Sequence, residues 1–312
     1  MSWVPTILTL QTIYEQTLAL STNQQSIEWA LSMLNRYHAF GRALNNVALI
    51  DDPHIAGASA LDELLNDPAA LAAATNNSII MSILSRSSVG MTAILRNPTA
   101  VTAIVNSQPA MTAMASSSLA MHLIFANPDA SAAVINSTMA ITTVTQNITA
   151  IESLYASAVA RPILAGNRAA MDIVAASRTA MDALRSRTAM LHAAMDTTPA
   201  REAIEGSATA IASMAAAPGR VTLTAPNTGS SGTLVPGRCW VISVTNGMMS
   251  AGGNWAQTTW RGILSGSDVV VPGGSSRQVV TVNRFANTLT WNTGTTMHSN
   301  ASDRQSATYI PL

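Results

Sequence analysis

The sequence predicts a mixed, elongated multidomain protein with a helical N-terminal base, a shaft of ten-residue mini-helix repeats and a C-terminal all-β head. Three observations predict this class. A ten-residue period runs through the middle of the chain, apolar residues precede it at helical spacing, and short Val- and Thr-rich runs with Gly-containing turns follow it. The predicted domains are an N-terminal helical domain at 1–59, a decapeptide-repeat shaft at 60–217 and a β-rich head at 218–312.

Charge is scarce in this chain. Only 10% of its 312 residues are charged, the formal net charge is zero, and 48% of the residues are hydrophobic. The chain contains no lysine, so it lacks the clustered basic charge with which proteins bind nucleic acid or anionic membranes. A thin repeat array with so many apolar residues is expected to bury part of them by self-association.

The N-terminus lacks the basic and apolar regions of a signal peptide, and no run approaches the ~18 apolar residues of a membrane-spanning helix. We therefore expect a chain made in a cytoplasm, without membrane insertion. Its one cysteine, Cys239, excludes an intrachain disulfide and a Cys-cluster zinc site. Cys239 lies in an apolar run typical of a strand, so we expect a buried structural thiol. No cofactor and no metal are predicted.

The N-terminal domain reads as a helical hairpin. Apolar residues recur at helical spacing from Val4 to Leu18 and again from Ile27 to Tyr37, with possible caps at 21–23 between the two stretches. Asp51-Asp52-Pro53 is the next stop signal. The hairpin is either a mounting base or a cap on the repeats.

The repeat is in phase with blocks of ten. Position 60 and every tenth position to 180 is Ala in eleven of thirteen cases, and the position seven further on is Asp, Asn or Ser in twelve of thirteen. The predicted shaft core is Met91, Ile94, Ile104, Met111, Met121, Ile124, Met171, Val174, Met181 and Leu184. The predicted helix caps are Ser87, Asn97, Ser107, Ser117, Asn127, Ser137, Asn147, Ser157, Asn167 and Ser177.

These positions predict one short helix per block. Ser, Asn and Asp satisfy free backbone N–H groups at a helix start, and Pro directly after the cap at positions 68, 98 and 128 costs no hydrogen bond. A continuous coiled coil is excluded, because a ten-residue period makes the apolar stripe drift about 80° per block and internal Pro breaks the helix. Such short helices are unstable alone and bury their Met and Ile faces against other blocks. We expect a homotrimer, with one stripe per helix closing around a three-fold axis; packing within one chain is the alternative.

The head is predicted to be a sandwich or jelly-roll-like unit. Candidate strands are 220–224, 240–245, 268–271, 278–282 and 288–292, separated by Gly-containing turns. It contains four of the six Trp, and six Arg against two Asp give it a formal charge of +4.

Little in the head indicates catalysis. Its only carboxylates, Asp268 and Asp303, lie in no recognisable motif, whereas glycoside cleavage usually requires a carboxylate pair. His298 with Ser299 and Asp303 offers the residue types of a triad without evidence of its geometry. We therefore expect a protein that is not an enzyme.

Aromatic side chains are the better candidates for function. Trp255 and Trp260 lie in a stretch rich in Gly, Asn and Thr that reads as a loop, where flat rings with polar neighbours suit sugars or protein epitopes. The alternative is that both rings lie in the core or at an interface. The predicted receptor-binding residues are Asn254, Trp255, Gln257, Trp260 and Arg261.

The Ser-x-x-Ala-Met motif at Ser117–Met121 and at Ser177–Met181 resembles repeats of bacteriophage tail-fibre proteins. The resemblance implies a homotrimer in the virion tail, made in the host cytoplasm. It further implies attachment to tail or baseplate proteins through the N-terminal domain, and recognition of a host surface glycan or protein by the head. Two alternatives stay open: a tail-borne polysaccharide depolymerase, and a cellular repeat adhesin or scaffold.

Overall fold

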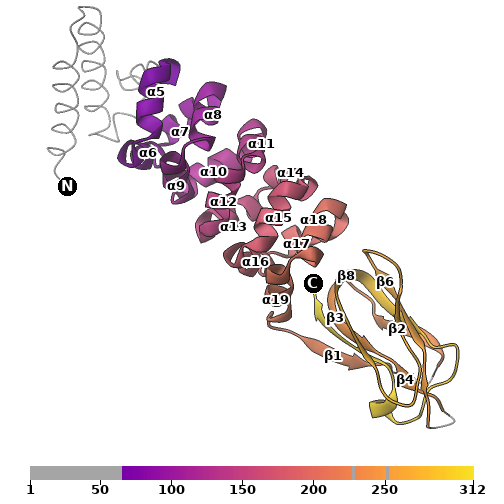
Figure 1. Ribbon diagram of the computed structural model, residues 1–312. Coiled ribbons are helices and arrows are strands. Elements are labelled where there is room, and N and C mark those ends of the chain that lie inside the picture. The colour runs from indigo at the N-terminus through magenta and orange to yellow at the C-terminus, as the bar shows by residue number, and fades with distance from the viewer. Residues whose placement is uncertain (1–64, 227–228, 251–252) are drawn as a thin grey trace, which may run out of the picture. The chain divides into compact units, whose positions relative to one another are not determined.

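The computed structural model describes residues 65–226, 229–250 and 253–312. The predicted helical hairpin at 1–59 lies outside these residues. Helices fill the chain from Pro68 to Ala215, and antiparallel strands follow, so a helical part with a C-terminal β domain is confirmed (Figure 1).

The chain divides into two compact units, Met1–Ala160 and Arg161–Leu312. The first contains the helices as far as α13, and the second contains the later helices and the β domain. The helices are α5 (Pro68–Thr75), α6 (Ser78–Leu84), α7 (Ser88–Arg96), α8 (Pro98–Val105), α9 (Gln108–Ala115), α10 (Ser118–Ala126), α11 (Pro128–Asn136), α12 (Thr138–Gln146), α13 (Ile148–Ala156), α14 (Ala160–Gly166), α15 (Arg168–Ala176), α16 (Arg178–Arg185), α17 (Thr188–Asp196), α18 (Thr198–Gly206) and α19 (Ala208–Ala215).

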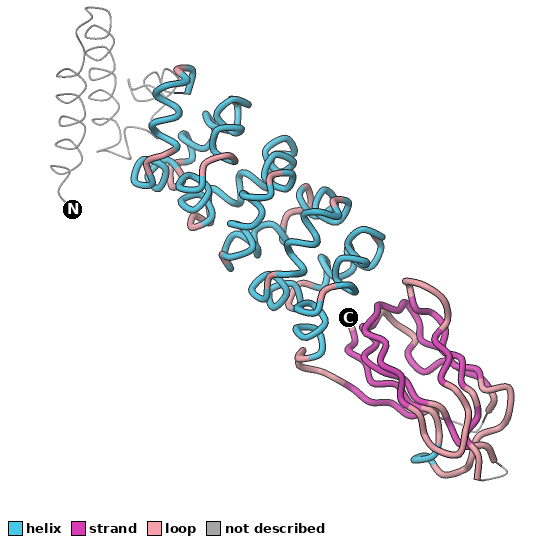
Figure 2. Tube along the Cα trace, in the orientation of Figure 1, coloured by secondary structure: helices cyan, strands magenta, loops and turns pink. Residues whose placement is uncertain are grey.

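Each block of ten is one helix of seven to nine residues, and a cap residue in extended conformation turns the chain between helices (Figure 2). All ten predicted caps accept a hydrogen bond from the N–H of the residue three positions later. No single described helix is long and apolar enough to span a membrane; the pair α9 and α10 meets that test only together, and it is bent by 102°. Three successive bends of 102° between helices would turn the direction of the chain through 306°, which is close to a full circle.

Three successive helices make one turn of the array, so each helix packs against the helix three places later in the chain. In the first unit α5 contacts α8, α6 contacts α9, and α10 contacts α13; in the second α15 contacts α18 and α16 contacts α19. Hydrogen bonds follow the same interval. Ser107 Oγ donates to the carbonyl of Thr75 at 2.7 Å, and Ser117 Oγ donates to that of Ser85 at 2.6 Å, in both cases 32 residues earlier. The same bond recurs from Asn97, Ser137, Ser157 and Ser207.

We call this series the cap ladder. Each cap side chain in it joins two helices, because it accepts from its own helix and donates to the end of the helix three blocks before it. The same interval explains the composition of the cap position. Ser and Asn both donate and accept, whereas Asp only accepts, and the single Asp among the twelve Asp, Asn and Ser residues at this position is Asp67.

The apolar face of the array is buried within one chain. All ten predicted core residues are 5% exposed or less, and Met91, Met111, Met121, Met171 and Met181 are fully buried. Three successive helices of one chain thus enclose the apolar side chains that we expected three chains to enclose. The apolar face of the array therefore does not require self-association, and the homotrimer stays a prediction.

The β domain consists of β1 (Val221–Thr224), β2 (Ser231–Val235), β3 (Cys239–Thr245), β4 (Gly247–Met248), β5 (Trp255–Ala256), β6 (Thr258–Ile263), β7 (Val269–Val271), β8 (Val279–Asn292) and β9 (Ser306–Pro311), with a short 3-10 helix, η1 (Ala301–Asp303). One seven-stranded sheet runs β1-β9-β3-β8-β6-β7, with β2 also on β8, and β4 pairs with β5 separately. Two of the predicted strands, 278–282 and 288–292, are parts of the single long strand β8.

β8 joins the two halves of this sheet. Its first half pairs with β3, and its second half pairs with β2 on one edge and β6 on the other. The core gathers side chains from both halves, including Val241 and Ala307 from one and Trp260 and Trp291 from the other. The sequence predicted two packed sheets. In the structure the strands form one hydrogen-bonded sheet, and side chains from its two halves share one core. Cys239 is in this core, and its burial raises the pKa of its thiol to about 12.

Gly262 is required where β6 changes register against β8. Its φ is +92°, and a Cβ there would lie 1.7 Å from the carbonyl oxygen of Thr288. Both the left-handed backbone and the close approach need glycine.

The ladder predicts that the array can be shortened by whole turns. Deleting residues 98–127 removes three blocks and joins Asn97 to Pro128, which reproduces the native Asn-Pro junction. Ser137 would then occupy the place of Ser107, with the carbonyl of Thr75 as its acceptor. We expect a single cooperative unfolding transition by circular dichroism. Deleting 98–122 instead puts caps and apolar positions out of phase, and we expect loss of cooperative unfolding; equal behaviour of the two deletions would contradict the ladder.

A single cap tests the bond itself. Replacing Ser117 with Ala removes the bonds to the N–H of Ala120 and to the carbonyl of Ser85, both in buried surroundings. We expect the free energy of unfolding to fall by about 1–3 kcal/mol in urea titrations. The control is Ser118→Ala at the exposed neighbouring position, where we expect a change within about 0.5 kcal/mol. Equal losses would show that the cap bonds contribute nothing.

Candidate functional site

Described segments of the β domain meet through backbone hydrogen bonds, and we call them the loop end: residues 246–250, 253–257, 272–278 and 296–306. Trp255 and Gly274 exchange two bonds of 2.7 and 2.9 Å, and the N–H of Ser250 donates to the carbonyl of Thr296. Met249 and Met297 form a further bridge. These hydrogen bonds hold the segments of the loop end against one another.

Trp255 and Arg277 form the centre of the loop end. The ring of Trp255 is half-buried, and the guanidinium carbon of Arg277 lies 5.9 Å from its centroid, within cation–π range. Arg277 is held in place by bonds to the carbonyl of Ser302 and to the hydroxyls of Thr245 and Ser306. An aromatic ring is thereby paired with an oriented guanidinium that is exposed to solvent.

Polar groups lie directly behind this pair. Thr245 and Ser306 are buried and share a hydroxyl contact of 3.2 Å. Asn246, fully buried, donates to the carbonyl of Pro272 and accepts from the N–H of Gln278. Gln305 is also fully buried, and neither of its amide atoms has a hydrogen-bond partner among the described residues. Such unpaired buried amides are rare in proteins.

The predicted receptor-binding residues separate in the structure. Trp260 belongs to strand β6 rather than to a loop; it is fully buried, and its Nε1 donates to the carbonyl of Thr245 at 3.0 Å. It is therefore a core residue, as the alternative interpretation held. Asn254, Trp255 and Gln257 lie at the loop end, whereas Arg261 lies on β6 and pairs with Asp268 at 3.1 Å.

The six Arg of the head differ in their partners. Arg261 pairs with Asp268, and Arg238 pairs with Asp196 of α17. Arg277 and Arg304, both at the loop end, have no carboxylate within ion-pair distance in the part of the chain that is described. Arg304 donates to backbone carbonyls, including those of Ala225 and His298. Both of these Arg residues therefore belong to the loop end, and Asp303, which lies between Ser302 and Arg304 in sequence, pairs with His298.

No arrangement for hydrolysis is assembled from these groups. Asp268 is paired with Arg261, and Asp303 lies 3.3 Å from Nδ1 of His298, so the two carboxylates are engaged separately. No described Ser hydroxyl is hydrogen-bonded to His298. No group of three or more His, Cys, Asp or Glu that could hold a metal ion occurs within residues 65–226, 229–250 and 253–312.

The last helices of the second unit hold the β domain through polar contacts. Glu205 of α18 accepts a hydrogen bond of 2.9 Å from the N–H of Phe285, at the point where β6 stops pairing with β8. Arg238 makes a two-pronged bond to Asp196. Burial raises the pKa of Glu205, against the opposing effects of the Phe285 N–H, Ser265 and nearby Arg side chains.

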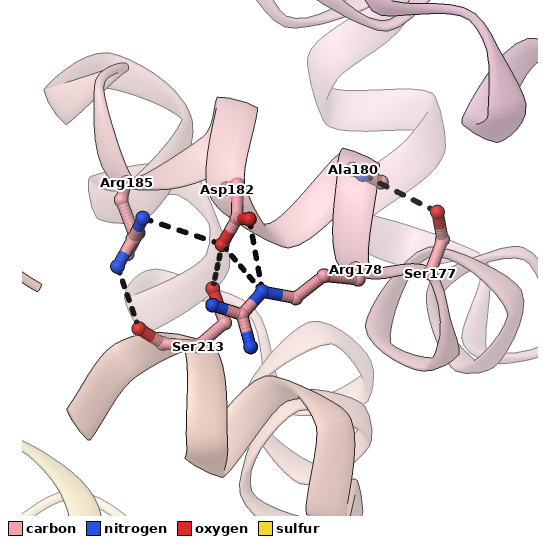
Figure 3. Close-up of polar contacts among 6 residues, drawn as sticks. All are labelled: Ser177, Arg178, Ala180, Asp182, Arg185 and Ser213. Atoms are coloured by element: carbon pink, nitrogen blue, oxygen red, sulfur yellow. Dashed lines mark hydrogen bonds and ion pairs between the residues drawn. The ribbon is translucent and has the colours of Figure 1, made fainter. Parts of the chain in front are cut away.

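In α16 and α19 an ionic cluster joins stacked helices (Figure 3). Asp182 accepts from Ser213 Oγ at 2.6 Å and from Arg178 Nε, and Arg185 bridges Asp182 and the carbonyl of Ser213. The hydrogen bond from Ser213, followed by that from Arg178, lowers the pKa of Asp182. The bond between Ser213 and Asp182 joins residues 31 apart in the chain, so it stabilises the packing of a helix on the third helix after it, as the cap ladder does.

Arg277 was not among the predicted site residues. The signal available for it was weak: one Arg in a Gly- and Ser-rich turn that follows Pro272. Only the backbone pairing of this turn with Trp255 brings the two side chains together.

No protein-family model matches this sequence, and comparison with curated proteins finds no match.

The partly buried Glu205 predicts a pH dependence of stability. Because its pKa is raised in the folded state, the stability of the native protein falls as pH rises from the ordinary carboxyl range through the raised value. Glu205→Gln keeps an acceptor for the N–H of Phe285 and removes this ionisation. We expect the variant to be at least as stable as the native protein at neutral pH, with the advantage vanishing in acid.

Thermal unfolding across this pH range measures the effect. Glu202→Gln, at an exposed carboxylate of the same helix, controls for loss of one negative charge. A Glu205→Gln variant that is less stable than the native protein at neutral pH would contradict the interpretation.

Proposed function

We propose that this chain is a structural fibre protein of a bacteriophage tail, in which the helical array is an elongated shaft and the β domain attaches to the host surface. The observation that carries the proposal is the division of roles along the chain. The recurring residues of the array are buried in its core or cap its helices. The loop end, in contrast, has the half-buried Trp255 and Arg277, whose guanidinium has no carboxylate partner among the described residues.

This division favours a spacer that carries a recognition surface. An array built from interchangeable blocks gains length at little cost in new contacts, because each helix stacks only on near neighbours. Attachment through the N-terminal domain at 1–59 to tail or baseplate proteins completes the proposal, as does a virion location; both come from the resemblance of the decapeptide motif. A non-enzymatic role is favoured by the separate engagement of Asp268 and Asp303.

A homotrimer is part of the proposal and now needs a different physical basis. Since one chain buries the core of its own array, trimer contacts would involve outer surfaces of the array or the β domain. Light scattering of the purified chain is the direct test. A mass of roughly three times 32.5 kDa supports a trimeric fibre, and a stable monomer at micromolar concentration contradicts it.

The attachment role predicts adhesion without cleavage. Fluorescently labelled full-length chain, incubated with a panel of bacterial strains, is expected to bind a subset of strains and to inhibit adsorption of phages that share their receptor. Surface glycans extracted after incubation are expected to keep their length by gel filtration. Shortened glycans would favour a depolymerase, and failure to bind any strain would contradict host attachment.

A further inference from the structure

We propose that the loop end binds an acidic glycan, with a sugar ring stacked on Trp255 and a sugar carboxylate bound by Arg277. The inference rests on the proposed attachment function and names the ligand class of that surface. Two features of the loop end support it: the ring of Trp255 and the charge of Arg277.

The Arg277 guanidinium lies over one face of the Trp255 ring, so a sugar would stack on the opposite face, in polar surroundings. Trp255 is half-buried, and Asn254 and Gln257 beside it in sequence are exposed. Pyranose rings present C–H groups that pack on an indole face while their hydroxyls bond to neighbouring amides. A single Trp with two amide side chains suits a sugar better than an extended apolar peptide, which needs a groove or a free strand edge.

The charge of Arg277 selects an anion. Arg277 has its Nη atoms fixed by Thr245, Ser306 and the carbonyl of Ser302, so its orientation is set before a ligand arrives. Its guanidinium is not neutralised by a carboxylate among the described residues, unlike those of Arg238 and Arg261 on the same domain. A preoriented guanidinium binds a carboxylate strongly, and a single one falls short of the basic stripe that nucleic acid requires.

The first experiment changes the ligand and leaves the protein intact. Full-length chain is titrated calorimetrically with glucuronate-, galacturonate- and sialate-containing oligosaccharides, each beside its carboxyl-reduced neutral counterpart. We expect at least one acidic oligosaccharide to bind about tenfold or more tightly than its neutral counterpart, and the difference to shrink as salt is raised. Equal affinity for the members of every pair, or binding of none, would overturn the ligand class.

The second experiment locates the site. Trp255→Ala and Arg277→Gln are each expected to weaken binding of the acidic oligosaccharide about tenfold or more. Arg220→Gln, which removes the same charge from an exposed residue just before β1, is the matched control and should bind as the native chain does. Since Arg277 also holds loop residues, unchanged thermal unfolding is required of each variant, and Trp255→Ala alone decides the matter if Arg277→Gln is destabilised.

The outcomes distinguish this inference from the proposed function. Adhesion to bacteria that survives both Trp255→Ala and Arg277→Gln would overturn the site while leaving attachment intact. Adhesion abolished by protease treatment of the cells, with no acidic oligosaccharide bound, would replace the glycan with a protein receptor. Absence of adhesion to any strain would remove the proposed function itself.

Discussion

The fold of the array depends on cap side chains that both accept and donate a hydrogen bond, as shown at Asn97, Ser107, Ser117, Ser137, Ser157 and Ser207. Helices of seven to nine residues are too short to be stable alone, so each must be held at its start and against its neighbours. The Oγ of Ser117 does both, since it accepts from the first turn of its own helix and donates to the end of the helix three blocks earlier. The buried Met and Ile side chains then fill the space that this spacing defines.

Stability is accordingly distributed in different ways over the chain. In the array each helix contacts near neighbours in sequence, so its stability is close to a sum of local contributions. The β domain depends instead on β8, which pairs with three strands, and on β9, which returns to pair with β1. Glu205 and Arg238 tie the last helices of the second unit to this sheet. The β domain thereby covers the end of a repeat array, which repeat proteins commonly need for solubility.

Much of the array could be predicted from the sequence, because the block period fixes caps and core positions independently of the path of the chain. The 32-residue interval of the ladder could not, since it arises from the bend at each cap, a property of backbone angles rather than of residue type. Because the bend at each cap could not be predicted, the sequence favoured packing between three chains over packing between three successive helices of one chain. In the head, Gly and Thr near Trp260 resembled a loop, although Gly262 marks a strand that changes register. Arg277 reaches Trp255 only through loop pairing, which carries no sequence period.

The distribution of charge connects the array to the proposed role of the head. Between Asn97 and Ile151 the only charged residue is Asp129, and the solvent face of this stretch consists largely of Ser, Thr, Asn and Ala. Several of its Thr hydroxyls, such as those of Thr102 and Thr112, bond to their own helix and so offer little to a ligand. A surface of this kind exerts no long-range electrostatic attraction. On the proposed function, Arg277, which has no carboxylate partner among the described residues, would attract an anionic ligand to the β domain rather than to this part of the array.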